Sequence, residues 1–174
     1  MTSSLIKGVP LFRHVTEEGF FSTLTTQLAP VVFMRHETLI LEQSHNDEMF
    51  FLVRGDAMEL RGLPTPHLHR RLGPGDYCGE NMLLRQQSIS SVVAHTPCEC
   101  FVLKAHKLRE VLAYFPNADE ALAAQVQQAQ QDKKDEELKK AQKALAVAAA
   151  AGRGAPAAAT DLSLIHISEP TRPY

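Results

Sequence analysis

The sequence predicts an α+β fold: an antiparallel β-roll of the jelly-roll type, preceded by a short N-terminal helical segment and followed by two C-terminal helices. Residues 31–104 contain short runs rich in Val, Leu and Phe that are separated by turn residues, which is typical of a small antiparallel roll or barrel. On both sides of this region, apolar residues recur at helical spacing. Without its Ala-rich end, the chain of 174 residues is long enough for one compact domain.

Residues 1–30 are expected to form the N-terminal helical segment of this domain. The apolar side chains that would share one helix face are Phe20, Phe21, Leu24 and Leu28. Thr16 and the acidic Glu17 and Glu18 predict the start of this helix, because hydroxyls and carboxylates cap helix N-termini. Pro30 predicts its end.

Residues 31–104 are expected to form the β-roll. The predicted strands are residues 31–34, 38–42, 48–55, 57–62, 90–95 and 98–104. Residues 62–66 and 73–76 carry the Gly, Pro and Asp of sharp turns. The odd cysteine number and the lack of a CxxC motif predict neither a disulfide framework nor a zinc site, and favour a reducing cytosol. Cys98 and Cys100 are expected on opposite faces of the last strand.

Residues 105–150 are expected to form two helices. The first carries Leu108, Val111, Leu112 and Phe115 on one face and is expected to stop at Pro116. The second begins near Ala118 and is built from the strong helix formers Ala, Gln, Lys and Glu. Its expected anchors are Leu122, Val126, Leu138 and Leu145. Two interpretations stay open, a solvated helix that frays towards its end or a contact with a partner helix or oligomer.

Residues 151–174 are expected to form a disordered tail. Residues 162–172 look like the in-frame translation of a sequencing-library adapter, which would make the reading frame truncated. No functional role is therefore assigned to His166, Glu169 or Arg172.

Composition argues against several classes of function. The formal net charge of −2 and the isoelectric point near 6.4 leave no basic excess for nucleic acid. The apolar runs are too short for a membrane span or a signal peptide. Phosphate-binding loops, nucleophile elbows and kinase signatures are missing, so the sequence predicts no enzyme, no catalytic residue and no cofactor.

The segment from residue 72 to residue 94 carries the binding hypothesis. Residues 79–84 are expected to form one helical turn, whose free backbone N–H groups would attract an anion. Glu80 beside this turn can accept hydrogen bonds from a diol. N–H donors together with one carboxylate suit a cyclic phosphate on a ribose.

Four motifs in the same order resemble the cyclic nucleotide-binding domain family. Residues 9–12, VPLF, are similar to the opening of this domain in cyclic nucleotide-gated and hyperpolarisation-activated channels, and residues 49–55, MFFLVRG, are similar to the family's M-Y-F-I-x-x-G strand. Residues 75–84, GDYCGENMLL, resemble the phosphate-binding cassette G-x-Y/F-F-G-E-x-x-L-L. Residues 111–116 resemble the penultimate helix with its following proline. The resemblance covers residues 5–130.

The resemblance implies a ligand-binding site and a role for its residues. Glu80 would contact ribose hydroxyls, and the backbone at Gly79 and Asn81 would meet the phosphate. Leu122 and Val126 of the last helix would cover the base. The full set of expected ligand-binding residues is Gly79, Glu80, Asn81, Met82, Leu83, Arg85, Ser88, Ile89, Val92, Leu122 and Val126.

The sequence also departs from the family pattern. Ser88 stands where the family has its phosphate-binding Arg, and Ile89 stands where members that respond to cyclic GMP often have Thr. Either Ser88 or Arg85 would replace the missing Arg. Cys78 replaces the aromatic residue before Gly-Glu, the loop after Leu84 is short, and Gln43 and Asn46 replace two turn glycines. We therefore expect weakened or lost binding, with cyclic AMP favoured over cyclic GMP.

The function that this resemblance implies is that of a regulatory module, a fragment of the cytosolic gating domain of a cation channel subunit. Its partners would be the upstream channel segments and the other subunits of a homotetramer. The full protein would be anchored to the membrane, but this domain would neither insert into the membrane nor bind nucleic acid. One alternative is the regulatory domain of a cyclic-nucleotide-dependent kinase or another signalling protein. An alternative of another class is a cupin-like metal-binding barrel that uses His67, His69, Glu80 and His95, but the spacing of Glu80 after His69 fits it poorly.

Overall fold

The computed structural model of the protein describes residues 2–151, which fall into two compact units divided after Gln130. The predicted tail and the adapter-like residues 162–172 lie outside the described residues. The helical elements are α1 (Thr2–Lys7), η1 (Pro10–Phe12), α2 (Phe20–Thr26), α3 (Asn81–Leu84), α4 (Ala105–Leu112) and α5 (Pro116–Ala151). The strands are β1 (Ala29–Phe33), β2 (Thr38–Ile40), β3 (Glu48–Arg54), β4 (Ala57–Arg61), β5 (His67–Leu72), β6 (Tyr77–Cys78), β7 (Ser91–Ala94) and β8 (Cys98–Lys104).

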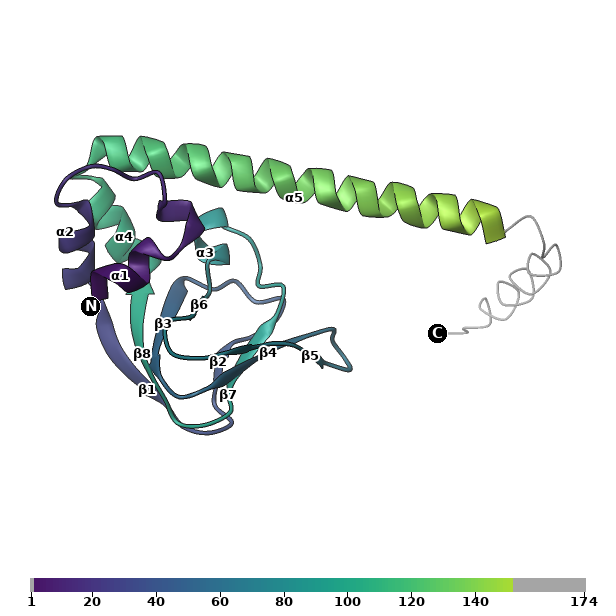
Figure 1. Cartoon of the computed structure of the whole chain (residues 1–174), viewed down its shortest axis with the longest axis horizontal. Helices are drawn as coiled ribbons and strands as arrows, with labels where there is room; N and C mark the ends of the chain where they lie inside the picture. The colour runs from purple at the N-terminus through teal and green to yellow at the C-terminus, as the bar shows by residue number, and fades with distance from the viewer. Residues whose placement is uncertain (1, 152–174) are drawn as a thin grey trace, which may run out of the picture. The chain divides into compact units, whose positions relative to one another are not determined.

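The strands form the predicted antiparallel roll. One four-stranded sheet has the order β1-β8-β3-β6 and the other has the order β2-β7-β4-β5 (Figure 1). Apolar side chains fill the space between the two sheets, among them Phe50, Leu52, Leu72, Val92 and Cys100. Strands β5 and β6 were not predicted, because β5 is almost wholly exposed and β6 has only two residues.

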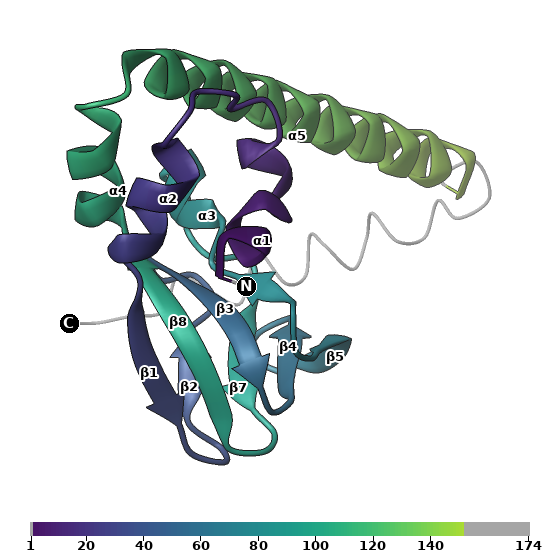
Figure 2. The same cartoon turned by 60° about the vertical axis from the view of Figure 1, so that its left-hand side comes forward.

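A second apolar core joins the helices to the roll. Helices α1, α2 and α4 gather at one end of the sheets (Figure 2), and their buried side chains include Ile6, Phe20, Leu24 and Leu108. The rings of Phe20 and Phe115 meet edge to face with centroids 5.8 Å apart. Such aromatic contacts add about 0.5–1.5 kcal/mol beyond the area that they bury.

The predicted helix boundaries are wrong in three places. Helix α2 begins after Gly19 and has no side-chain cap, and Pro30 lies within β1 rather than at the helix end. Glu17 instead accepts a hydrogen bond of 2.8 Å from the N–H of Ala118, so it caps the start of α5, about a hundred residues away. Pro116 is the first residue of α5, a position that tolerates proline because the first helical N–H has no intrahelical partner.

The expectation that Cys98 and Cys100 face opposite sides of the sheet is also wrong. Residues two apart in a strand share a face, and both side chains point into the core between the sheets. All three cysteines are free and buried. Burial raises the pKa of Cys100 to about 12, so its thiol stays protonated at neutral pH.

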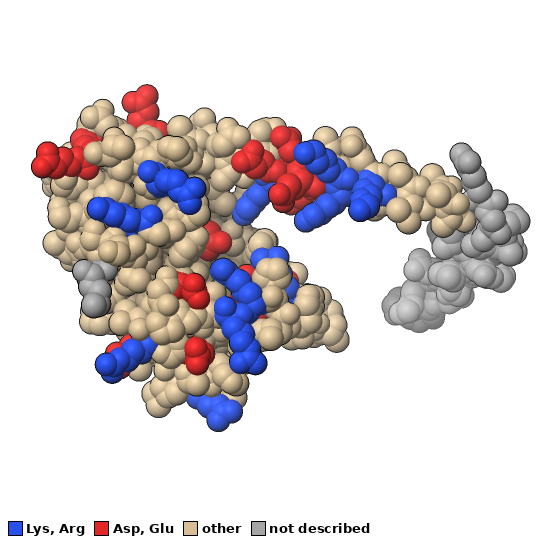
Figure 3. All heavy atoms as spheres, in the orientation of Figure 1, with Lys and Arg blue, Asp and Glu red and all other residues tan. Residues whose placement is uncertain are grey.

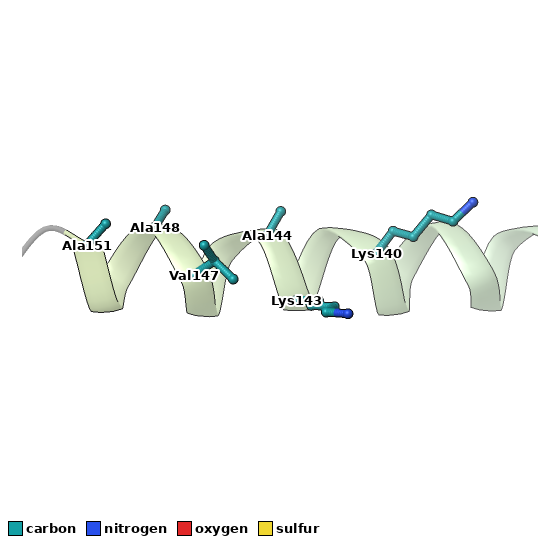
Figure 4. Close-up of a pocket in the computed structure, with 6 residues that line it drawn as sticks. All are labelled: Lys140, Lys143, Ala144, Val147, Ala148 and Ala151. Carbon is teal, nitrogen blue, oxygen red and sulfur yellow. The ribbon is translucent and has the colours of Figure 1, made fainter.

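Helix α5 divides into an anchored start and an exposed end. Leu122 is buried and Val126 packs against the helical core, as predicted. Leu138 and Leu145 are 58% and 72% exposed, so the prediction that they anchor the helix is wrong. Figure 4 shows residues 140–151, where Ala144, Ala148 and Ala151 point to one side of a single helix, which by itself forms no enclosed site.

The loop between β2 and β3 carries the two residues that stand at family glycine positions. Gln43 has a φ of +66°, a left-handed conformation that is unfavourable for side chains with a Cβ atom. Asparagine tolerates this conformation better than most residues, but Asn46 is not among the described residues with positive φ. Its side chain instead bonds both backbone groups of Glu48, accepting from the N–H at 3.3 Å and donating to the carbonyl.

We predict that Gln43→Gly stabilises the protein by about 0.5–1 kcal/mol, because glycine adopts the left-handed region without steric strain. The N–H of residue 43 keeps its bond of 2.7 Å to the carbonyl of Ser88. Thermal unfolding measures the change, and Asn46→Gly is the matched control, expected to destabilise because it loses the two bonds to Glu48. A lower melting temperature for Gln43→Gly would contradict this interpretation of the turn.

Candidate functional site

The cassette segment is held against the first residue of β3 by a glycine. Gly79 has a φ of +92°, and a Cβ atom there would overlap the carbonyl oxygen of Glu48 and crowd the amide of Asn46. The two backbones therefore approach more closely than any side chain allows. Gly79 fixes where the following helix begins.

The predicted helical turn is present as α3, and Glu80 precedes it as the N-cap residue. The N–H groups of Met82 and Leu83 bond to the carbonyls of Gly79 and Glu80 at 3.1 Å and 3.0 Å. The Glu80 carboxylate makes no capping bond, so it is not used in holding its own helix. Arg85 ends α3 in the left-handed conformation with a φ of +52°.

An open groove of about 730 Å³ lies within the first unit, beside α3. Its walls come from α3, α4, the first part of α5 and the loop at residues 45–47. It brings together five predicted site residues, Met82, Leu83, Arg85, Leu122 and Val126. The other six do not line it: Gly79, Glu80, Asn81, Ser88, Ile89 and Val92.

Gln130 connects the two helical walls of this groove. Its side-chain amide donates a hydrogen bond of 3.0 Å to the carbonyl of Leu84, at the C-terminal end of α3. Sequence reasoning missed this residue, although Leu122, Val126 and Gln130 follow one another at i,i+4 spacing and so share a helix face. The bond satisfies a helix-end carbonyl that has no partner within its own helix.

Of the predicted residues outside the groove, Ser88 and Ile89 lie on the segment that leads into β7, and Val92 lies in β7. Val92 is buried in the core between the sheets. Ser88 is only 4% exposed, and its hydroxyl has no hydrogen-bond partner among the described residues. Ile89 is 52% exposed, so it lies on the opposite side of the segment from Ser88.

A buried carboxylate in β4 is a feature that the sequence reasoning missed. Glu59 is 6% exposed and accepts hydrogen bonds from the Ser90 hydroxyl at 2.7 Å and from Arg61 at 3.3 Å, while Arg70 of β5 also pairs with it. Alternation along β4 could have revealed it, because Ala57 and Glu59 share the inward face.

The environment of Glu59 favours its ionised form. Burial pushes the pKa of Glu59 upwards, but the hydrogen bonds from Ser90 and Arg70 and the positive charge of Arg70 outweigh burial, and its pKa lies below the ordinary value of 4.5. The pKa of Arg70 is raised, because contact with Glu59 outweighs the burial of the guanidinium. Both groups are therefore charged at neutral pH.

Figure 3 shows how charges are distributed on one face. Acidic and basic side chains of the described residues both occur there, and one short run of basic side chains lies near the middle of the face. On β5, His67 and His69 are exposed, and residues 2–151 contain no group of three His, Cys, Asp or Glu side chains placed to hold a metal ion. Within the same residues, no helix has the length and apolar character needed to span a membrane.

Comparison with known proteins identifies the family. Residues 30–115 match the family described as the cyclic nucleotide-binding domain. "Cyclic nucleotide-gated ion channel 1" of Arabidopsis thaliana is 31% identical over 125 residues, which cover 64% of this chain and 17% of that protein. "Putative cyclic nucleotide-gated ion channel 13" of the same plant is 33% identical over 124 residues, covering 64% and 18%. The chain thus matches less than a fifth of the length of either relative.

Solved structures share the fold. The N-terminal domain of a transcriptional regulator from Streptomyces coelicolor has a TM-score of 0.65 at 21% identity, covering 76% of this chain and 93% of that one. The regulatory domain of Toxoplasma gondii PKA, crystallised with cAMP, has a TM-score of 0.58 at 18% identity, covering 78% and 49%. These likenesses confirm the predicted fold class.

We predict that Glu59→Gln destabilises the protein by about 1–3 kcal/mol at pH 7, because the charged hydrogen bonds to both arginines weaken. A carboxyl with a lowered pKa stabilises the fold above its ordinary value of 4.5, and this contribution is lost as the pH falls further. The difference between variant and wild type should therefore shrink below pH 4.5.

Chemical denaturation between pH 3 and pH 7 measures this difference. Glu99→Gln is the control, because Glu99 pairs with Arg54 at 3.8 Å on the exposed surface and should change stability little at any pH. A constant difference for Glu59→Gln across this range would contradict the assignment of a buried, ionised Glu59.

Proposed function

We propose that this chain, whose residues 30–115 belong to the cyclic nucleotide-binding domain family, is a regulatory module of the cytosolic gating domain of a cation channel subunit. Its binding of cyclic nucleotides is weakened, and cyclic AMP is its preferred ligand. The full protein is a membrane-anchored homotetramer in which upstream segments form the pore. This module binds no nucleic acid and does not itself enter the membrane.

The observation that carries the proposal is the arrangement around α3. Gly79 fixes the start of α3 beside the roll, and the Glu80 carboxylate makes no capping bond there. Helix α5 brings Leu122 and Val126 to the groove that α3 also lines. A carboxylate suits the ribose hydroxyls, and apolar side chains suit the face of a purine. Sites that bind small ligands typically combine mostly apolar walls with a few polar groups that orient the ligand.

The weakening follows from Ser88. A hydrogen bond to a charged group contributes about 1.5–3 kcal/mol, or roughly 10- to 150-fold in affinity. A serine hydroxyl can donate one neutral bond in place of the guanidinium but supplies no charge. The loss is partial, because the backbone of the cassette keeps its place.

Channel relatives favour a channel context over the alternatives. Both Arabidopsis relatives are named as cyclic nucleotide-gated channels and are more than 30% identical over the domain. The transcriptional regulator and the PKA domain share the fold at lower identity, so a kinase-type or other signalling regulator is the second candidate.

The bond between Gln130 and Leu84 suggests how ligand would be sensed. Helix α5 contacts the cassette helix directly, so a ligand that binds better when the two are together shifts α5 towards that position. The same coupling acts in reverse, because any force on α5 from the rest of the protein changes ligand affinity by the same factor.

We predict saturable binding of cyclic AMP to the full chain in calorimetric titration, with cyclic GMP bound more weakly. Glu80→Ala should reduce the affinity roughly 10-fold or more, because it removes a charged acceptor from the ribose. Glu18→Ala is the matched control, because it removes an exposed carboxylate that is far from Glu80 in the sequence. Absence of heat and of any thermal shift at millimolar ligand would show that ligand binding has been lost.

We further predict that Ser88→Arg tightens cyclic AMP binding roughly 10- to 150-fold, since it restores a charged donor at the family position. Thermal unfolding without ligand checks that the buried substitution is tolerated. An unchanged affinity in a folded variant would place the phosphate elsewhere.

A further inference from the structure

Two buried polar groups near the start of β7 lack partners. The Nε of Arg61 and the hydroxyl of Ser88 have no hydrogen-bond partner among the described residues. Leaving a buried donor unsatisfied costs about 1–3 kcal/mol, so native structures rarely contain two such groups in one region without a reason. The Nε of Arg61 can only donate and the Ser88 hydroxyl can donate as well as accept, so one acceptor group would satisfy both.

The two groups lie at the same end of one sheet. The pairing of β4 with β7 ends at Leu60, which lies opposite Ser91. Arg61 and Ser90 are the next residues of the two segments beyond this pair. One oxygen of Glu59 accepts from both Arg61, at 3.3 Å, and Ser90, at 2.7 Å. Ser88 is two residues before Ser90, and both are buried while Ile89 between them is exposed. Ser88 and Ser90 therefore lie on the buried side of this segment, and Arg61 meets Ser90 through the shared oxygen of Glu59.

Arg61 fits an anion better than the other nearby arginines. Arg85 is exposed at the end of α3, on the side of the groove. Arg70 already uses its Nε on Glu59. The side chain of Arg61 is 35% exposed and is held through one terminal nitrogen, which leaves its buried Nε available.

Resting on the proposed function, we propose that Arg61 of β4 supplies the guanidinium that binds the ligand's phosphate, in place of the arginine that is missing at Ser88. A guanidinium presents parallel N–H donors that match two oxygens of a phosphate. The Ser88 hydroxyl donates to the same group. Neither Ser88 nor Arg85 alone then replaces the family arginine.

Glu59 keeps this cation in place when no ligand is bound. Its buried carboxylate pairs with both Arg61 and Arg70, whose side chains are partly exposed, so the three groups together carry one net positive charge. A bound phosphate shares Arg61 with Glu59 and is repelled by that carboxylate. The site therefore keeps a positively charged group but binds phosphate weakly, because Glu59 competes for that group.

The test compares cyclic AMP with adenosine, which has the base and ribose but no phosphate. We expect Arg61→Gln to weaken cyclic AMP roughly 10- to 100-fold in a titration of the full chain followed by NMR, and to leave adenosine within twofold. Arg61→Lys should keep part of the affinity, because it retains the charge without the parallel donors. Arg71→Gln, which removes an exposed arginine of β5, is the matched control.

Each alternative outcome has a separate meaning. An unchanged affinity for cyclic AMP in Arg61→Gln, or in Arg61→Lys if the first variant does not fold, overturns the proposal while leaving the proposed function intact. Equal losses for cyclic AMP and adenosine also overturn it, because they indicate a structural effect. A large loss in Arg85→Gln instead assigns the phosphate to Arg85. If the wild type binds neither compound, the proposed function fails and this inference fails with it.

Discussion

Strand β3 is buried on both of its faces, and the placement of the other elements depends on this strand. Phe50 and Leu52 point into the core between the sheets, whereas Met49 and Phe51 point into the core under the helices. A continuous apolar run is what a strand buried on both sides requires. One strand thus serves as the common wall of two cores, and the helices cannot shift relative to the roll without uncovering it.

The cassette takes its position from the first residue of the same strand. Gly79 packs on the carbonyl of Glu48, and Asn46 bonds both backbone groups of Glu48. Residue 48 therefore aligns β3, the loop before it and the start of α3 at once. From there α3 reaches Gln130 of α5 through the carbonyl of Leu84. The path from the buried strand to the last helix therefore combines closely packed backbone with hydrogen bonds from two side-chain amides, those of Asn46 and Gln130.

The local pattern of apolar residues was enough to predict most elements. Apolar side chains are buried at regular spacing in the strands of residues 48–61 and 91–104 and in the first turns of the helices after residue 105. It failed where the partner is distant in sequence. Glu17 has the residue type of a local cap, but the N–H that it accepts from belongs to Ala118. Leu138 has the residue type of an anchor, but nothing in spacing shows whether a surface faces it. Five groove residues were predicted through the family resemblance. Spacing along β4 and α5 could have pointed to Glu59 and Gln130, but their hydrogen-bond partners come from distant segments and are visible only in three dimensions.

The cluster around Glu59 is difficult to explain by stability alone. Removing the Glu59 carboxylate from water costs several kcal/mol, and well-packed apolar side chains often stabilise a core equally well or better. The core between the sheets consists of such apolar side chains, for example Leu72 and Val92. A buried carboxylate with two partly exposed guanidinium partners is explained more simply if a guanidinium has a second task that apolar residues cannot perform. The carboxylate then acts as a counter-ion that keeps the guanidinium of Arg61 oriented until a ligand anion competes for it.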